Sequence, residues 1–261
     1  MEIKQVNVNG IEMKYAKFGA GEKEMVVIPG LNVNSVLDNA EAVENYYARF
    51  KEDYTVYLID RRINLPEVYT TRQMADDTVA VLKEIGIRNA YMHGASQGGT
   101  ILQEIAINYP EMVEKAVLAS TISRPSGETV QMVENWARWG KTRNREALEE
   151  QFLKIGYTDE FFNKYRDVLE GTILTASDEK LDKFAILAEA LRGFDTYDRL
   201  GQIKCETLVL GATGDKIFSY KDQIKIADKI GCDYYMFDGY SHCVYDEAPD
   251  YLDRLEEFFA K

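Results

Sequence analysis

A serine, an aspartate and a histidine lie at points of the sequence where they could cooperate in nucleophilic catalysis. Ser96 is the centre of GASQG, residues 94–98, Asp215 follows the run LVLGATG, and His242 follows FDGYS. A serine hydroxyl is a poor nucleophile without a neighbouring base. A histidine base in turn needs a carboxylate that fixes its tautomer and stabilises its charged form. The three residue types together could therefore transfer an acyl group.

The pattern Gly-x-Ser-x-Gly around Ser96 is typical of a nucleophilic serine when a strand precedes it and a helix follows. Residues 89–93 read as a strand, and a helix is expected from the motif to Tyr109. A serine on such a sharp turn has strained backbone angles, and only tiny residues fit two positions away on each side. The helix N-terminus would also stabilise an oxyanion beside the serine. The alternative is a glycine-rich turn that merely packs a helix on a strand.

The sequence contains two histidines, and the nearer one is the weaker candidate for a base. His93 is the last residue of the expected strand before Ser96, so we expect a core histidine there. His242 follows the last expected strand, in DGYSHCVYDEAP. Ligands in parallel α/β sheets bind beyond the carboxyl ends of the strands, which favours His242 as the base.

Three aspartates compete to orient that histidine. Asp238 precedes Gly239 and is expected to form a turn, while Asp246 precedes the last helix and could stabilise its N-terminus. Asp215 comes directly after the penultimate expected strand, although Gly-Asp is also turn chemistry. Its place at a strand end favours Asp215 as the acid.

Short apolar runs separated by helical patterns predict a mostly parallel sheet. An Asn-Gly pair at residues 9–10 predicts a hairpin, and Thr70 with Gln73 resembles a capping box. Helices are expected over residues 35–50, from Thr70 to Gly86, and over residues 219–230 and 248–260. The expected strands after the hairpin are residues 25–30, 54–60, 89–93, 114–120, and the runs ETLVL and CDYYMF.

The alternation of strands and helices is interrupted between Ser123 and Tyr197, where only helices are predicted. This stretch contains both tryptophans, Trp136 and Trp139, together with several phenylalanines. Their aromatic surface could bind an apolar acyl or alcohol group. Two tryptophans three residues apart on one helix face could equally pack the insertion against the rest of the protein.

Composition narrows the class of function. The chain has 261 residues, 46% of them hydrophobic, and a formal net charge of -13. That length fits one α/β domain with an insertion. A surface with this much negative charge repels nucleic-acid phosphates, and we therefore expect no nucleic-acid partner.

No uninterrupted apolar stretch is long enough for a membrane span, and the opening MEIKQVNVNG lacks the apolar run of a signal peptide.

The three cysteines, Cys205, Cys232 and Cys243, form no Cys-x-x-Cys pair and are odd in number. Reduced thiols and a cytoplasmic location are therefore expected. Neither histidine has metal-ligand spacing from a cysteine or another histidine, so no metal site is predicted.

The sequence resembles the α/β-hydrolase superfamily, in its cap-bearing branch of small esterases. The likeness rests on the order Ser96, Asp215, His242 and on Gly-x-Ser-x-Gly in its strand-turn-helix context. The resemblance implies an α/β-hydrolase fold: a mostly parallel central sheet, flanking helices, and a helical cap inserted before the penultimate strand. Residues 1–122 and 198–261 would form the core domain and residues 123–197 the cap.

The family's oxyanion hole implies two backbone N–H donors, those of Leu31 and Gln97. Here the loop after the third strand reads Pro29-Gly30-Leu31-Asn32, with proline in place of the family's usual histidine. The loop after the fourth strand, DRRINLPEVYTT, keeps Asp60 and Arg62 of the family pattern but lacks its glycines.

The resemblance implies a serine hydrolase, with carboxylesterase as the leading activity, that cleaves a carboxylic ester or related acyl compound through an acyl-enzyme. Its expected partner is a small, partly apolar substrate, and no cofactor is required. Hydrolysis of a C–C bond, lactone or amide by the same triad remains open. So does a ligand-binding sensor that keeps a slow triad. A homodimer is compatible with the sequence, in which nothing decides the oligomeric state.

Overall fold

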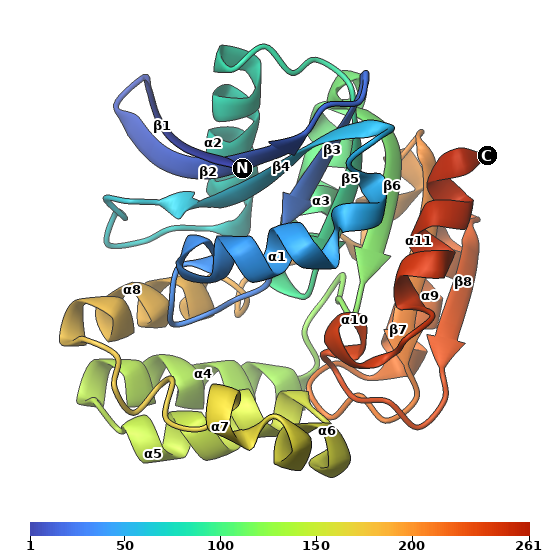
Figure 1. The fold of residues 1–261 in the computed structure, drawn as a ribbon. Helices are drawn as coiled ribbons and strands as arrows, with labels where there is room; N and C mark the ends of the chain where they lie inside the picture. Colours follow the sequence, from blue (N-terminus) through green and yellow to red (C-terminus); the bar gives the residue numbers. More distant parts are fainter.

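Eight strands form one sheet in the computed structural model, which describes residues 1–261. They are β1 (Glu2–Val8), β2 (Ile11–Gly19), β3 (Lys23–Ile28), β4 (Tyr54–Arg62), β5 (Ala90–Ala95), β6 (Val113–Ala119), β7 (Glu206–Ala212) and β8 (Asp233–Phe237). Their order across the sheet is β1-β2-β4-β3-β5-β6-β7-β8 (Figure 1). β2 runs antiparallel to β1 and β4, and every other neighbouring pair is parallel. The predicted mostly parallel sheet is confirmed.

Helices cover both faces of this sheet. They include α1 (Ala40–Tyr46), α2 (Thr71–Glu84), α3 (Gln97–Asn108), α9 (Tyr220–Ile230), α10 (Val244–Glu247) and α11 (Tyr251–Ala260). α2, α3 and α9 pack on one face, and α1 and α11 pack on the other. β3 is therefore buried on both sides, which is why its sequence is a continuous apolar run.

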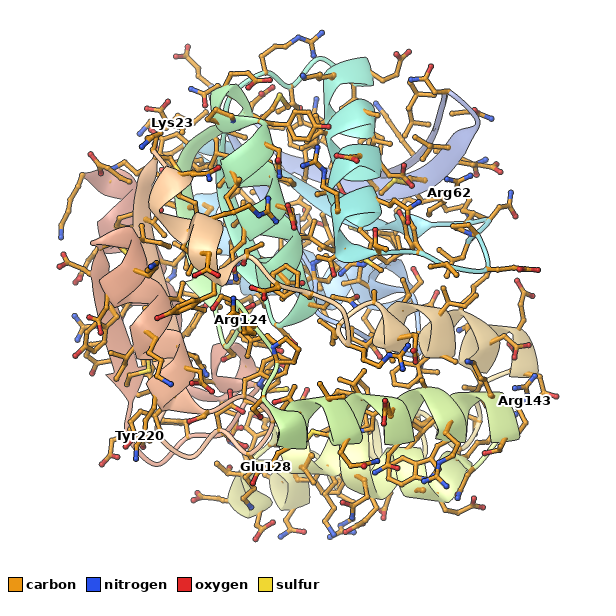
Figure 2. The ribbon with its side chains drawn as sticks, turned by 180° about the vertical axis from the view of Figure 1, so that it is seen from behind. Lys23, Arg62, Arg124, Glu128, Arg143 and Tyr220 are labelled. Atoms are coloured by element: carbon orange, nitrogen blue, oxygen red, sulfur yellow. The ribbon has the colours of Figure 1, made fainter.

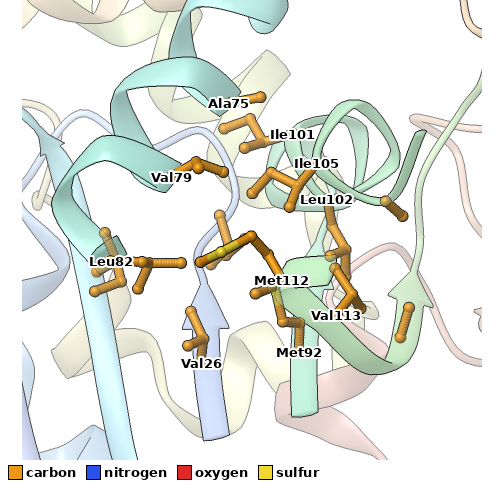
Figure 3. Close-up of a cluster of buried hydrophobic side chains, with 14 of the residues drawn as sticks. Val26, Ala75, Val79, Leu82, Met92, Ile101, Leu102, Ile105, Met112 and Val113 are labelled. Atoms are coloured by element: carbon orange, nitrogen blue, oxygen red, sulfur yellow. The ribbon is translucent and has the colours of Figure 1, made fainter. Parts of the chain in front are cut away.

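Successive side chains of β3 enter different cores because strand side chains alternate between faces. Val26 belongs to the core under α2 and α3, whereas Met25 and Val27 belong to the core under α1 and α11. Figure 3 shows Val26 and Met92 of neighbouring strands pointing toward the packed helices α2 and α3.

The local signals at the hairpin and at α2 are confirmed. Asn9 and Gly10 both have positive φ, 53° and 78°, as a type I′ turn requires. The Thr70 side chain accepts from the Gln73 N–H, and the Gln73 side chain accepts from the Thr70 N–H, which completes the capping box.

Two predicted helices are shorter or more broken than the sequence indicates. The helix expected over residues 35–50 consists of two 3-10 turns, Val36–Asn39 and Ala48–Phe50, on either side of α1. The last helix begins at Tyr251 instead of 248. Ala248 precedes Pro249 and is extended, since a proline disfavours helical angles in the residue before it. The one-turn helix α10 precedes that break.

Residues 123–197, between β6 and β7, contain helices and no strand. They include α4 (Gly127–Thr142), α5 (Arg145–Leu148), α6 (Asp159–Lys164), α7 (Arg166–Leu169), α8 (Asp178–Glu189) and a π-helical turn, Glu149–Leu153. In Figure 1 these helices lie along the bottom and lower left of the view, below β3 and β6. Figure 2 shows α4 from behind, with Glu128 and Arg143 near its two ends. We call residues 123–197 the helical segment.

Candidate active site

Ser96 lies on a sharp turn between β5 and α3. Its backbone angles are φ 53° and ψ -120°, which residues other than glycine rarely adopt. The two motif glycines have no room for a side chain: a Cβ at Gly98 would lie 2.0 Å from the Ile28 carbonyl oxygen, and one at Gly94 would lie 2.6 Å from the Gly98 carbonyl oxygen. The sequence motif therefore reflects a close approach of three backbone segments around Ser96.

A chain of hydrogen bonds joins Ser96, His242 and Asp215. The Ser96 Oγ lies 2.9 Å from His242 Nε2, and His242 Nδ1 lies 2.9 Å from Asp215 Oδ2. The Ser96 residue is 8% exposed, the His242 residue is 4% exposed, and the Asp215 side chain is fully buried. Residues 146 positions apart in sequence are thus brought into contact with little access for bulk water.

The Asp215 carboxylate is held by further donors. Its Oδ1 accepts the backbone N–H groups of Ile217 and Phe218, each at 2.8 Å, and its Oδ2 accepts Gln223 Nε2 at 3.0 Å. These bonds fix the orientation of the carboxylate toward His242. Sequence reasoning missed Gln223, because a glutamine in the first turn of α9 has no distinguishing pattern. The structure shows that Gln223 packs closely against Gly211: a Cβ at Gly211 would lie 1.9 Å from the Gln223 Oε1. A glycine at position 211 is therefore what leaves room for the Gln223 side chain.

His93 and the rival aspartates lie apart from this chain of hydrogen bonds. His93 is 2% exposed, and its ring nitrogens are hydrogen bonded to the hydroxyls of Tyr47 at 2.9 Å and Tyr251 at 2.7 Å. Burial lowers the pKa of His93 to about 4. Asp238 accepts from Thr213 Oγ1, and Asp246 accepts from the Tyr157 hydroxyl. The prediction that His93 is a core histidine agrees with these contacts.

The backbone N–H groups of Leu31 and Gln97 are among those near Ser96 that have no acceptor in the loops or side chains. Gln97 is the first residue of α3, where N–H groups have no helical partner and the helix dipole is positive. Leu31 follows Gly30, at which a Cβ would lie 3.1 Å from the Ser96 Cβ. Of the two donors that the resemblance implies, Gln97 thus follows Ser96 directly in the chain, and Leu31 adjoins Gly30, which packs against Ser96, and lines the same cavity as Ser96.

Ser96 and His242 line a cavity of about 830 Å³ between the sheet and the helical segment. Trp136 and Phe152 of the helical segment also line it, whereas Trp139 does not. Trp136 is buried, its ring meets Phe152 edge to face, and its Nε1 donates to the Gln151 carbonyl. Trp136 therefore combines the two roles left open by the sequence, cavity wall and core packing.

Residues 155–158 of the helical segment are attached to the loop that carries His242. The Cys243 N–H donates to the Gly156 carbonyl at 2.8 Å, and Ser241 Oγ donates to the Ile155 carbonyl at 3.2 Å. Thr158 donates from Oγ1 to Glu247 at 2.6 Å. At the opposite side of the cavity, Lys180 of α8 donates to Asn34 and Asp38, each at 2.9 Å.

The structure has no cluster of three or more His, Cys, Asp or Glu side chains that could hold a metal ion. All three cysteines are free thiols. None of its helices combines the length and the apolar character needed to span a bilayer.

Comparisons with known proteins find relatives both in sequence and in fold. Residues 25–255 match the model of the alpha/beta hydrolase family. The 3-oxoadipate enol-lactonase 2 of Acinetobacter baylyi is 23% identical over 217 residues, which are 81% of this chain and 79% of that protein. The alpha/beta hydrolase MGS-M2 from a Medee basin deep-sea metagenome library superimposes with a TM-score of 0.89 at 20% identity, over 99% of this chain and 98% of the other. A thermophilic esterase from Thermogutta terrifontis gives a TM-score of 0.83 at 20% identity, over 100% and 98% of the two chains.

Proposed function

This chain belongs to the alpha/beta hydrolase family, and from that premise we propose that it hydrolyses carboxylic esters through an acyl-enzyme formed on Ser96. The single observation that carries the proposal is the hydrogen-bonded chain from Ser96 through His242 to Asp215, whose two links each measure 2.9 Å. The chemistry requires no cofactor.

In the proposed reaction His242 is the general base. Its Nδ1–H donates to Asp215, which leaves Nε2 free to accept the Ser96 hydroxyl proton. Ser96 Oγ then bonds to the substrate carbonyl carbon, and the carbonyl oxygen becomes an oxyanion. His242 returns the proton to the departing alcohol.

Deacylation repeats these steps with water. His242 takes a proton from water, the resulting hydroxide attacks the acyl carbon, and the acid leaves as Ser96 recovers its proton. The N–H groups of Leu31 and Gln97 are the proposed donors to both oxyanions. A donor of this kind is worth roughly 3–4 kcal/mol of barrier.

We assign residues 123–197 as a cap over a core of residues 1–122 and 198–261. Support comes from a hydrophobic cluster in which Val133, Trp136 and Phe184 of the helical segment pack with Val33 and Phe218 of the remainder. The cap would supply the aromatic wall of the cavity, which suits a small, partly apolar substrate.

Lactone hydrolysis is the second candidate, because the Acinetobacter relative is named an enol-lactonase. A lactone is an internal ester, so the same residues would act, and the opened alcohol would stay attached to the acyl group until water released it. Relative rates on matched esters and lactones distinguish the two activities.

The test combines labelling with turnover. A fluorophosphonate probe should label Ser96 of the folded protein, and Ser96→Ala should abolish both labelling and hydrolysis across a panel of esters, lactones and amides. Ser120→Ala is a matched control, because Ser120 is also a buried strand-end serine with positive φ but lies outside the cavity lining. Ester turnover that survives in Ser96→Ala would refute the proposed nucleophile, and a folded wild type that is never labelled would favour the sensor.

A further inference from the structure

We propose that Asp60 and Arg61, consecutive residues at the end of β4, are positioning residues that hold the loop of residues 29–35 against Ser96. We call this loop the oxyanion loop, because it contains Leu31. The inference rests on the proposed function, since it assigns a task to residues around the same nucleophile.

The oxyanion loop has almost no backbone hydrogen bonds of its own. No N–H or carbonyl of residues 29–34 pairs with another backbone group. Within the loop, the Asn34 N–H makes only a 3.4 Å contact with the Asn32 side chain. The position of the Leu31 N–H therefore depends on side chains that reach the loop from elsewhere.

Arg61 binds the beginning of the loop. Its Nη2 donates to the Pro29 carbonyl at 2.5 Å. Pro29 precedes Gly30, the residue next to the Ser96 Cβ, so this bond acts two residues from the proposed donor Leu31. Where the family usually has a histidine, this loop has a proline, and Arg61 supplies a polar contact from a neighbouring strand.

The Arg61 guanidinium has no competing partner. It forms no ion pair with any carboxylate, although the neighbouring Arg62 pairs with Asp77 at 3.4 Å. Its Nε is buried without a hydrogen bond, and desolvation lowers the pKa of the guanidinium. The charge of the neighbouring Asp60 opposes this shift without forming an ion pair, so the charge-assisted bond to the Pro29 carbonyl is the hydrogen bond that the guanidinium of the half-buried Arg61 makes.

Asp60 binds the end of the loop. One oxygen of its carboxylate accepts from Ser35 Oγ, and the other accepts from the Arg61 backbone N–H at 2.8 Å. Two adjacent residues on a buried strand thus hold both ends of a loop that lacks a hydrogen-bond ladder. The rigidity of β4 is transmitted to the Leu31 N–H in this way.

The proposal makes a specific kinetic prediction for Arg61→Met. A loosened oxyanion donor weakens transition-state binding more than substrate binding. We expect kcat to fall by about tenfold or more with KM changed less than about threefold. Affinity for an alkyl boronic acid, which forms a tetrahedral anion on the serine, should fall in parallel with kcat, while the affinity for the product acid should not.

Three further variants complete this experiment: a conservative replacement, a second test of the loop and a matched control. Arg61→Lys should recover part of the lost kcat because an ammonium can still donate to Pro29. Ser35→Ala should reproduce a weaker form of the defect, and it provides the test if Arg61→Met does not fold. Arg88→Met is the matched control, since exposed Arg88 also donates to a backbone carbonyl at 2.5 Å, far from the cavity.

Two results would overturn the proposal. Arg61→Met with a raised KM and an unchanged kcat would make Arg61 a substrate-binding residue. Wild-type kcat and boronate affinity in both Arg61→Met and Ser35→Ala would leave the loop independent of β4. Failure of the proposed function is separate, because it would appear as normal turnover in Ser96→Ala measured beside these variants.

Discussion

Ser96 and Ser120 have similar backbones and different surroundings. Both follow parallel neighbouring strands, both are buried, and both have positive φ, 53° and 43°. Ser96 Oγ is hydrogen bonded to His242, whereas Ser120 Oγ has no hydrogen-bond partner. A strained backbone at a strand end therefore does not by itself bring a serine to a base, and of these two serines only Ser96 has the adjacent imidazole that the proposed chemistry requires.

The two histidines should respond oppositely to substitution. His242→Ala should lower kcat by roughly 10⁴-fold or more with little change in thermal stability, and Asp215→Asn should lower it by about 10⁴-fold. His93→Ala should instead destabilise the fold, since it removes two buried hydrogen bonds, and should leave kcat of the folded fraction close to wild type. Steady-state kinetics and thermal melts of all three proteins provide the measurement. A larger loss of kcat in His93→Ala than in His242→Ala would mean that the base is misassigned.

At the level of elements, the turn between β5 and α3 depends on close packing with two neighbours. The N-terminus of α3 approaches the end of β3 at Gly98, and it approaches Thr121, just past β6, at Gly99. The Thr121 hydroxyl donates to the Ser96 carbonyl at 2.8 Å. The turn is therefore supported from both sides, which keeps Ser96 in its strained conformation.

Gly98→Ala should be one of the most damaging single-methyl changes in this chain. Its Cβ would lie 2.0 Å from the Ile28 carbonyl oxygen, and backbone at the centre of a sheet cannot move away cheaply. We expect a loss of about 3 kcal/mol or more in the free energy of unfolding, measured by urea denaturation. Gly127→Ala is the control, because a Cβ there meets nothing within 4 Å, and it should be neutral or slightly stabilising. Equal stability of the two variants would contradict this account of the turn.

At the level of the whole molecule, the sheet positions the polar side chains of the candidate site, and the helical segment supplies apolar side chains to the wall of the cavity. Ser96, Asp215 and His242 follow β5, β7 and β8, so all three meet at the carboxyl edge of the sheet. Trp136 and Phe152 reach the same cavity from the helical segment. Side chains from the edge of the sheet and from the helical segment thus line one cavity.

Global stability should depend on pH through the buried histidine. Burial lowers the pKa of His93 from 6.5 to about 4, so the unfolded chain gains a proton near pH 6.5 that the folded chain does not take up until about pH 4. The free energy of unfolding should then fall as the pH drops through this window, by at most about 3.5 kcal/mol at roughly 1.4 kcal/mol per pH unit. Above pH 7 this contribution is absent.

Urea denaturation of wild type and His93→Gln between pH 7 and pH 4.5 isolates that contribution, because the other titrating groups are common to both proteins. The difference in unfolding free energy should shift in favour of the variant as the pH falls. A pH-independent difference would show that His93 titrates alike in the folded and unfolded chains.

Much of this architecture could be predicted from local patterns. Apolar runs located the strands, and Asn9-Gly10 and Thr70 with Gln73 located a turn and a helix start, because their physical causes lie within a few residues. The break before the last helix also has a local cause, because Pro249 keeps Ala248 extended. Gln223 and Arg61 could not be identified in advance, since their roles exist only through contacts with Asp215 and Pro29 across the fold.

The attachment of residues 155–158 to the His242 loop constrains how substrate can enter. Hydrogen bonds from Cys243 and Ser241 join the two segments. Swinging this side of the helical segment outward would pull the imidazole away from Ser96, so each opening would disable the enzyme. The α8 side is attached differently, because Lys180 donates to Asn34 of the oxyanion loop and forms an exposed ion pair with Asp38. Salt screens exposed ion pairs, so the Lys180–Asp38 contact should weaken with ionic strength while the hydrogen bonds to the His242 loop remain.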